Sequence, residues 1–114
     1  MAQLSRSLRE GGRCISTTFL NAVVATDNGT WMYGGDLEKL TIDVSGITNA
    51  TIQVRGSNAL QPPANSSHGV QIGSDITSDM LVSVDMPVNW IKVMVSIYVA
   101  GTIYSRVIGH RVGR

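Results

Sequence analysis

Residues 90–99, with the sequence WIKVMVSIYV, constrain the fold of this chain more than any other segment. Their β-branched and aromatic side chains predict a β-strand. A strand with one buried face alternates apolar and polar residues, because successive side chains point to opposite sides of the sheet. One side of this segment carries Ile91, Val93, Val95, Ile97 and Val99, and the other carries the large apolar groups of Trp90, Met94 and Tyr98. The strand therefore needs cover on both faces.

The two sides of this strand predict two different contacts. The aliphatic side is expected to line the core, since burial of apolar surface stabilises the folded state. Trp90, Met94 and Tyr98 would then form an apolar stripe on the outer face, which a monomer in water should not leave exposed. We expect a second copy of the chain, in a homodimer, or a partner protein to cover this stripe. The alternative is that a loop or the N-terminal segment folds over it.

Turn signals divide the remaining chain into short strands. Asn28 and Gly29 form the strongest of them, because Asn-Gly tolerates the positive φ angles of a type I′ hairpin. The polar residues 57–69 predict a long loop. Ala100 and Gly101 predict a two-residue hairpin within the last pair of strands. The predicted strands are residues 14–25, 31–33, 38–44, 50–56, 70–73, 80–85, 89–99 and 102–109.

These strands predict an all-β protein, folded as a single-domain β-sandwich or jelly-roll-like barrel. Charged residues make up only 15% of the chain, against about 25% in an average domain. Ser, Thr, Asn and Gly take their place, as is typical of turn-rich β-proteins. The 114 residues suit one domain. Residues 14–114 are expected to form this domain, and residues 1–13 to form a basic N-terminal arm that two glycines separate from it.

Basic residues concentrate at the two ends of the chain. Residues 1–13 hold three arginines and one glutamate, a net charge of +2, and residues 106–114 hold three arginines, a net charge of +3. Residues 14–105 hold three basic and seven acidic residues, a net charge of −4. Basic ends on an acidic body favour contact with an acidic partner, and solvated tails are the alternative. The candidate partner-binding residues are Arg6, Arg9, Arg13, Arg55, Arg111 and Arg114.

No set of side chains suggests catalysis or metal binding. His68 and His110 lack a second ligand at the spacing of a zinc site. Cys14, the only cysteine, is expected to be a small buried side chain rather than a nucleophile. The aspartates within residues 75–85 lack the alternating spacing of a calcium loop, and no nucleotide-binding or nucleophile motif occurs. We therefore expect no enzyme activity, no metal, no cofactor and no small-molecule substrate.

Two classes of partner are also unexpected. Nucleic-acid binding usually needs a basic face with aromatic residues, whereas here only the ends are basic and aromatic residues make up 5% of the chain. No apolar run approaches the ~18 residues of a membrane span, and residues 1–13 lack the apolar run of a secretory signal. We expect a protein that is made in a cytoplasm and has neither a nucleic-acid nor a membrane partner.

Two stretches resemble small all-β structural proteins of tailed bacteriophages: TIQVRGSN, residues 51–58, and LVSVDMPVNWIKVMVSIYVAGTI, residues 81–103. In those proteins a strand that ends in Arg-Gly-Ser-Asn is followed by an aromatic-Ile-Lys/Arg-Val strand and a hairpin that ends in Gly-Thr-Ile. The matching residues are Ile52, Val54, Arg55, Gly56, Ser57, Asn58, Trp90, Ile91, Lys92, Val93, Gly101, Thr102 and Ile103. Residues 1–49 lie outside the resemblance.

Within this group the chain is most similar to capsid decoration (cement) proteins of the epsilon15 type. This resemblance implies a jelly-roll-like virion protein, not an enzyme, that binds the major capsid protein on the outside of the head. It also implies a dimer, for which Trp90, Met94 and Tyr98 are the expected interface, and assembly in the host cytoplasm. The same motifs occur in β-domains of tail fibres and baseplates. The alternative is therefore a module that recognises host carbohydrate through aromatic residues such as Trp31, Tyr33 and Trp90.

Overall fold

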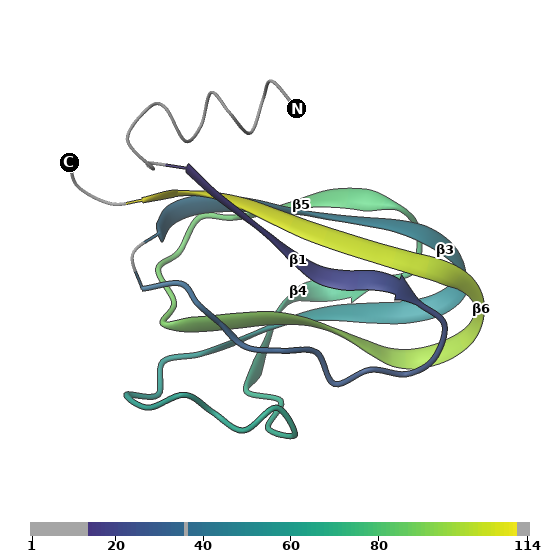
Figure 1. Ribbon diagram of the computed structural model, residues 1–114, viewed down its shortest axis with the longest axis horizontal. Coiled ribbons are helices and arrows are strands. Elements are labelled where there is room, and N and C mark those ends of the chain that lie inside the picture. The colour runs from purple at the N-terminus through teal and green to yellow at the C-terminus, as the bar shows by residue number, and fades with distance from the viewer. Residues whose placement is uncertain (1–13, 36, 112–114) are drawn as a thin grey trace.

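The computed structural model describes residues 14–35 and 37–111, and all regular elements in them are β-strands. The strands are β1 (Cys14–Val23), β2 (Met32–Tyr33), β3 (Leu37–Ser57), β4 (Val70–Ile76), β5 (Met80–Val84) and β6 (Trp90–Arg111) (Figure 1). The predicted all-β class is therefore confirmed. In this part of the chain no helix is long and apolar enough to cross a membrane. The predicted arm, residues 1–13, lies outside the described residues.

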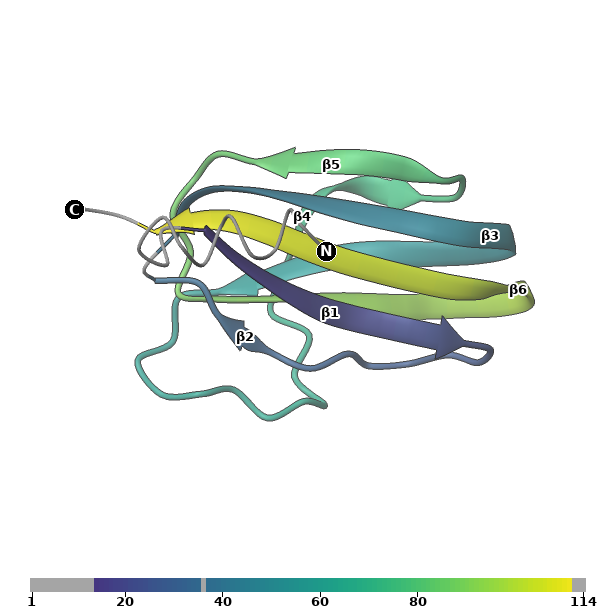
Figure 2. The same cartoon turned by 45° about the horizontal axis from the view of Figure 1, so that its top comes forward.

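β3 and β6 organise the fold, because each is long enough to belong to two layers. β3 has 21 residues and β6 has 22, and they pair antiparallel from Leu37 opposite Arg111 to Ser57 opposite Trp90. Both strands bend near the middle, so the sheet doubles back on itself (Figures 1 and 2). The first half-sheet has the order β1-β6-β3-β5 and the second has the order β2-β6-β3-β4. Since all six strands belong to one antiparallel sheet, the predicted jelly-roll topology is not confirmed.

Gly46 in β3 and Gly101 in β6 permit the bend. Their φ angles are 81° and 125°, values that residues with a side chain rarely adopt. A Cβ atom on Gly46 would also overlap the carbonyl oxygen of Thr102. The hairpin predicted at Ala100 and Gly101 is wrong, because the pairing register shifts there and the chain continues as one bulged strand. The two strands predicted between residues 38 and 56 are likewise the two halves of β3.

The inward-facing side chains of the two half-sheets form one apolar core. The alternation predicted for the first part of β3 is confirmed, because Leu40, Ile42 and Val44 are buried while Thr41 is exposed. The buried core residues are Leu20, Leu37, Leu40, Ile42, Val44, Ala50, Ile52, Val54, Ile76, Val84, Val88, Ile91, Val93, Val95, Ile103 and Val107. They come from every strand except β2, so the core joins both halves of the sheet.

A bulge in β6 changes which of its residues face the core. The first three predicted core residues of this strand are buried, but Ile97 and Val99 are 57% and 63% exposed, contrary to prediction. Three residues of β6, Val95 to Ile97, lie opposite only two residues of β3, Thr51 and Ile52. One additional residue moves the following side chains to the other face of the sheet. Tyr98 consequently packs against the core between two exposed neighbours.

The predicted turn around Gly29 forms, but it does not close a hairpin. Gly29 has the expected positive φ angle, 77°, and its N–H donates to the Asp27 carboxylate at 2.7 Å. Asp27 meanwhile pairs with Val95, donating its N–H at 3.1 Å and accepting at 2.9 Å. A Cβ atom on Gly29 would overlap the carbonyl oxygen of Val93, so this segment lies directly against β6. The type I′ hairpin prediction is wrong because pairing with β6 extends the second half-sheet instead.

Candidate interaction surface

The stripe predicted as a dimer interface is not open on this chain. Met94 is only 4% exposed. Trp90 is partly buried, and its indole N–H donates to the carbonyl oxygen of Ala59 at 3.1 Å. Tyr98 packs against the core, and its hydroxyl donates to the carbonyl oxygen of Gly101 at 2.6 Å. The three side chains therefore do not form one apolar stripe that needs a partner to cover it, and dimerisation through them stays a prediction.

The loop between β3 and β4, residues 58–69, lies over part of the second half-sheet, and we call it the strap. Lys92 of β6 is fully buried, and its ammonium donates to the carbonyl oxygens of Asn65 and Ser67 at 2.9 and 2.7 Å. The same ammonium lies 4.8 Å from the ring centre of Trp31, which is a cation–π distance. The indole N–H of Trp31 donates to another strap carbonyl at 3.0 Å. A loop thus covers this face, as the alternative reading of the sequence expected.

The surroundings of the Lys92 ammonium indicate that this charge serves to hold the strap on the sheet. Burial lowers the pKa of its ammonium, because removal from water disfavours the charged form. The positive charge of Arg55 lowers this pKa further, and the negative charge of Asp27 opposes the shift. Sequence analysis missed this role, although one signal was present. Lys92 stands in a strand with apolar residues on both faces, where a charged group needs partners from another segment.

A chain of polar side chains crosses the outer face of the second half-sheet. Arg55, a predicted partner-binding residue, is partly buried and donates through Nε and Nη2 to Oε1 of Gln53 at 3.1 and 2.5 Å. Gln71 and Gln53 donate to the Asp75 carboxylate at 2.8 and 3.0 Å. These two hydrogen bonds lower the pKa of Asp75, because they stabilise its ionised form. Arg55 is therefore engaged within the sheet, and its contact with another protein stays a prediction.

The other predicted partner-binding residues fall outside what the structure describes. Arg6, Arg9, Arg13 and Arg114 lie beyond the described range, and Arg111 ends β6 without a described side chain. Their role stays a prediction.

Within residues 14–35 and 37–111, no group of three or more His, Cys, Asp or Glu side chains is placed to hold a metal ion. His68 is exposed on the strap, and His110 is exposed on β6. The main-chain register puts Cys14 opposite His110. Asp79 accepts a hydrogen bond from the backbone N–H of Ile47 at 3.0 Å, so it supports the bend of β3.

No segment among residues 14–35 and 37–111 covers the outer face of the first half-sheet, and we call it the open face. Cross-strand pairing sets its side chains in rows: Arg106 of β6 lies opposite Thr18 of β1 and Asp43 of β3, and Asp43 lies opposite Leu81 of β5. The outward-facing residues are Ser16, Thr18, Lys39, Thr41, Asp43, Ser45, Leu81, Ser83, Asp85, Tyr104, Arg106, Ile108 and His110. Hydroxyl groups alternate there with charged side chains and with three exposed large side chains from β5 and β6.

A shallow hollow of about 220 Å³ lies on the open face, where β3, β5 and the end of β6 meet. Its lining combines Leu40 and Ile108 with Lys39, Asp85 and His110. Protein–protein interfaces typically mix apolar and polar groups in this way. Ligand sites are usually deeper, mainly apolar cavities that enclose most of a small molecule. The open face therefore suits contact with another protein better than contact with a small ligand.

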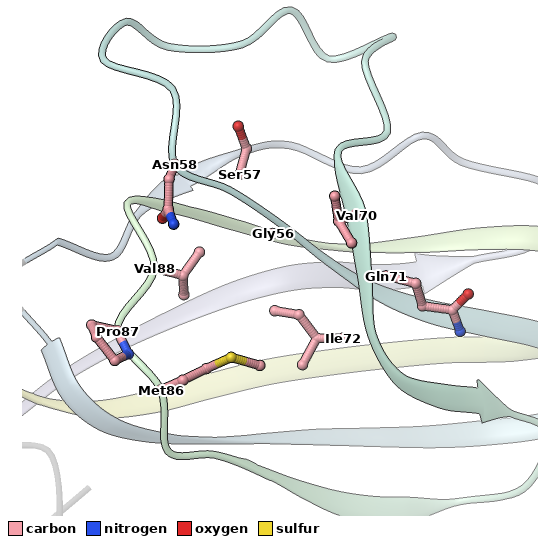
Figure 3. A pocket seen from close by; sticks show the side chains of 9 residues that line it. All are labelled: Gly56, Ser57, Asn58, Val70, Gln71, Ile72, Met86, Pro87 and Val88. Atoms are coloured by element: carbon pink, nitrogen blue, oxygen red, sulfur yellow. The ribbon is translucent and has the colours of Figure 1, made fainter.

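A second hollow, of about 210 Å³, opens between the start of β4 and residues 86–88 (Figure 3). The side chains of Ile72, Met86 and Val88 project into it. A Cβ atom on Gly56 would lie 2.8 Å from Cδ1 of Ile72 and 3.1 Å from Cγ2 of Val88, so the glycine keeps this hollow open at its base. None of the lining residues is charged. The hollow can accept an apolar side chain but holds no group for acid–base chemistry.

The sequence matches no protein-family model and no curated protein. Among solved structures, the fold is similar to that of the SPBc2 prophage-derived protein YomS, with a TM-score of 0.66, 18% sequence identity, and coverage of 84% of this chain and 91% of that chain. Disulfide-linked pili of Bacillus endospore appendages give a TM-score of 0.38 at 11% identity, with coverage of 88% and 84%. The coat protein of Tobacco streak virus gives a TM-score of 0.32 at 8% identity, with coverage of 91% and 90%. The likeness to YomS shows a shared fold, whereas the two lower TM-scores do not indicate one.

Proposed function

We propose that this chain is a structural protein of a phage virion and that it decorates the outside of the head as a cement protein. The open face carries this proposal, because no described segment covers this side of the four-stranded half-sheet. Its mixture of hydroxyl, charged and isolated apolar groups suits a protein partner. The shared fold with a prophage-derived protein and the sequence resemblance to phage structural proteins support the virion setting.

The proposed mechanism is stabilisation by contact area. Each copy binds the major capsid protein through the open face and bridges neighbouring capsid subunits, so that many modest interfaces add up over the shell. The basic ends of the chain reach acidic patches of adjacent subunits. No catalytic step, cofactor or metal takes part. Assembly takes place in the host cytoplasm, and each decorating unit is a homodimer.

A pair of lysine substitutions tests the proposal on heads of the encoding phage that lack the protein. Ile108→Lys places a charge on the open face, where Ile108 is 55% exposed, and Leu60→Lys places one on the strap, where Leu60 is 90% exposed. Neither change should alter the melting temperature by more than a few degrees, because surface substitutions usually shift stability by about 0.5 kcal/mol or less. Ile108→Lys should weaken head binding about tenfold or more, and Leu60→Lys should not. Unchanged binding by a folded Ile108→Lys protein would rule out the open face.

A tail-fibre or baseplate module that binds host carbohydrate is the second candidate. The rings of Tyr33 and Trp90 form an edge-to-face pair with centres 5.2 Å apart, and Tyr33 is exposed. Exposed aromatic rings can stack on sugar faces, although the buried Trp31 cannot join them. Copy number in purified virions separates the two candidates. Hundreds of copies per particle support head decoration, and a few to a few dozen copies support a tail component.

A further inference from the structure

β5 has a free edge on the rim of the first half-sheet (Figure 2). It pairs with β3 alone, and no other described strand pairs with its second side. Such an edge directs alternate backbone N–H and C=O groups away from the sheet, where another strand can pair with them. Proteins usually protect exposed edges by means of bulges, prolines, charged side chains or very short strands.

The other described edge strands carry such protection. β1 has two register shifts against β6, and Ala22 near its end has a φ angle of 54°. β4 has a register shift in the stretch that contains Gly73, whose φ angle is 78°. β2 has only two residues. In contrast, all five residues of β5 pair with residues 40–44 of β3 in one uninterrupted register.

The side chains of β5 also favour pairing. Its sequence, MLVSV, contains no charged residue, proline or glycine. Met80 and Leu81 are 47% and 67% exposed. Asp79 and Asp85 flank the strand. The Asp79 carboxylate accepts a hydrogen bond from the backbone N–H of Ile47 at 3.0 Å, and the Asp85 carboxylate accepts one from the hydroxyl of Ser83 at 3.2 Å. The edge is therefore uncharged in the middle and negative at both ends.

We propose that the β5 edge binds an extended segment of another protein by strand addition, and that this segment has an apolar centre flanked by lysine or arginine. Strand addition derives affinity from main-chain hydrogen bonds and specificity from side chains. Basic flanks set positive charges beside Asp79 and Asp85, which an acidic or neutral segment cannot do. The proposal concerns the edge alone and holds wherever the chain is placed in a virion.

A second copy of β5 fits this edge less well. In antiparallel pairing centred on Val82, Asp79 of each copy lies opposite Asp85 of the other. Like charges directly opposite each other destabilise a strand pair. Shifted registers avoid this repulsion but lose pairs from a strand of only five residues. The two aspartates thus favour a basic partner and oppose self-pairing.

The test is an NMR titration of the full chain with a synthetic peptide of five alternating valines and threonines between two lysines. The expected result is saturable shift changes and slowed amide exchange in residues 80–84 at millimolar peptide. A second peptide with glutamates in place of the lysines should bind about tenfold more weakly. This difference should shrink at high salt, because salt screens exposed charges.

Matched variants assign the effect to the flanking charges. Asp79→Asn together with Asp85→Asn keeps an acceptor oxygen at each site but removes both charges, so the two peptides should then bind alike. Asp75→Asn, the same change on edge strand β4, should preserve the preference for the lysine peptide. The proposal is overturned if neither peptide affects residues 80–84, if both bind the unmodified chain equally, or if the shifts map to β1 or β4. Concentration-dependent protection of residues 80–84 without peptide would assign the edge to a second copy and overturn it as well.

Discussion

Replacement of Lys92 by methionine should release the strap from the second half-sheet. Methionine has a similar length and can fill the space, but it donates no hydrogen bond. The carbonyl groups of Asn65 and Ser67 then lose their donor, and Trp31 loses its cation–π contact. The remaining core contacts of β6 should be unaffected, because Lys92 lies between the core residues Ile91 and Val93 and so points to the opposite side of the strand. The variant therefore isolates the contribution of this one contact.

The size of the effect follows from these contacts. Each of the two partly buried carbonyls that loses its partner costs about 1 kcal/mol, the low end of the range for unsatisfied groups, because water can reach the strap once it lifts. Loss of the cation–π contact adds about 0.5–1 kcal/mol, while relief from burying a charge offsets part of the total. A net loss of about 2 kcal/mol is expected. For a chain of this size it corresponds to a fall of roughly 8 °C in melting temperature.

The lowered pKa of Lys92 provides a second readout. The folded-state pKa lies below the ordinary value of 10.5. Between these two values the unfolded chain binds more protons than the folded chain, so the free energy of unfolding rises with pH across this window. Below the folded-state pKa, Lys92 contributes no pH dependence. Lys92→Met should abolish the rise, while Lys39→Met, at an exposed lysine, should preserve it.

Urea denaturation from neutral pH to about pH 10.5, combined with limited proteolysis of the strap, measures both effects. The expected result for Lys92→Met is lower stability, faster cleavage within residues 58–69 and a flat alkaline profile. A melting temperature within about 2 °C of the wild-type value, together with an uncut strap, would refute the reasoning. A Lys92 side chain that exchanges freely between its carbonyl partners and water would also give this refuting result.

Four further substitutions test other parts of the structure. Gly46→Ala should cost about 3 kcal/mol of stability or prevent folding, because alanine disfavours a φ angle of 81° and its Cβ would overlap β6. A thermal melt measures the loss, and a variant as stable as the wild type would contradict the bend described at Gly46. Ser105→Ala should preserve stability or raise it by about 1 kcal/mol, because the buried hydroxyl of Ser105 has no partner among the described residues. A clear loss of stability in urea denaturation would show that this hydroxyl does have a partner. Met94→Lys should cost about 3 kcal/mol, since it buries an amine; an unchanged melting temperature would mean that Met94 is exposed. Val99→Lys should keep the melting temperature and, by light scattering, convert the predicted homodimer to a monomer; a Val99→Lys protein that remains dimeric would place the interface elsewhere.

Sequence alternation predicted the strands well because the signal is local. Leu40, Ile42 and Val44 repeat with a period of two residues, and each strand segment can be identified without knowledge of its partner. The connections were harder to predict. Glycine with a positive φ angle can close a hairpin or create a bulge, and at Gly101 the outcome depends on the approach of Gly46 from the other strand. Sequence alone does not supply that contact.

The cover over β6 depends on contacts that are distant in sequence. Lys92 meets carbonyl groups 25 and 27 residues away in the strap, and Trp31 donates to a carbonyl 33 residues away. The two-faced strand correctly predicted that a cover is needed, but the alternation does not identify the covering segment. The polar composition of residues 58–69 gave no apolar signal either, since the strap is held through its main-chain carbonyls.

The bulge in β6 also relocates the surface that a homodimer would use. It turns Ile97 and Val99 outward at the bend of the sheet. Val24 is exposed as well, and it belongs to the connection after β1 that runs beside this part of β6. A two-fold contact at the bend would bury these side chains and leave both the open face and the β5 edge free for other proteins. A dimer through Trp90, Met94 and Tyr98 would first have to displace the strap, at the cost of the Lys92 contacts. The structure therefore favours the bend over Trp90, Met94 and Tyr98 as the interface of the predicted dimer.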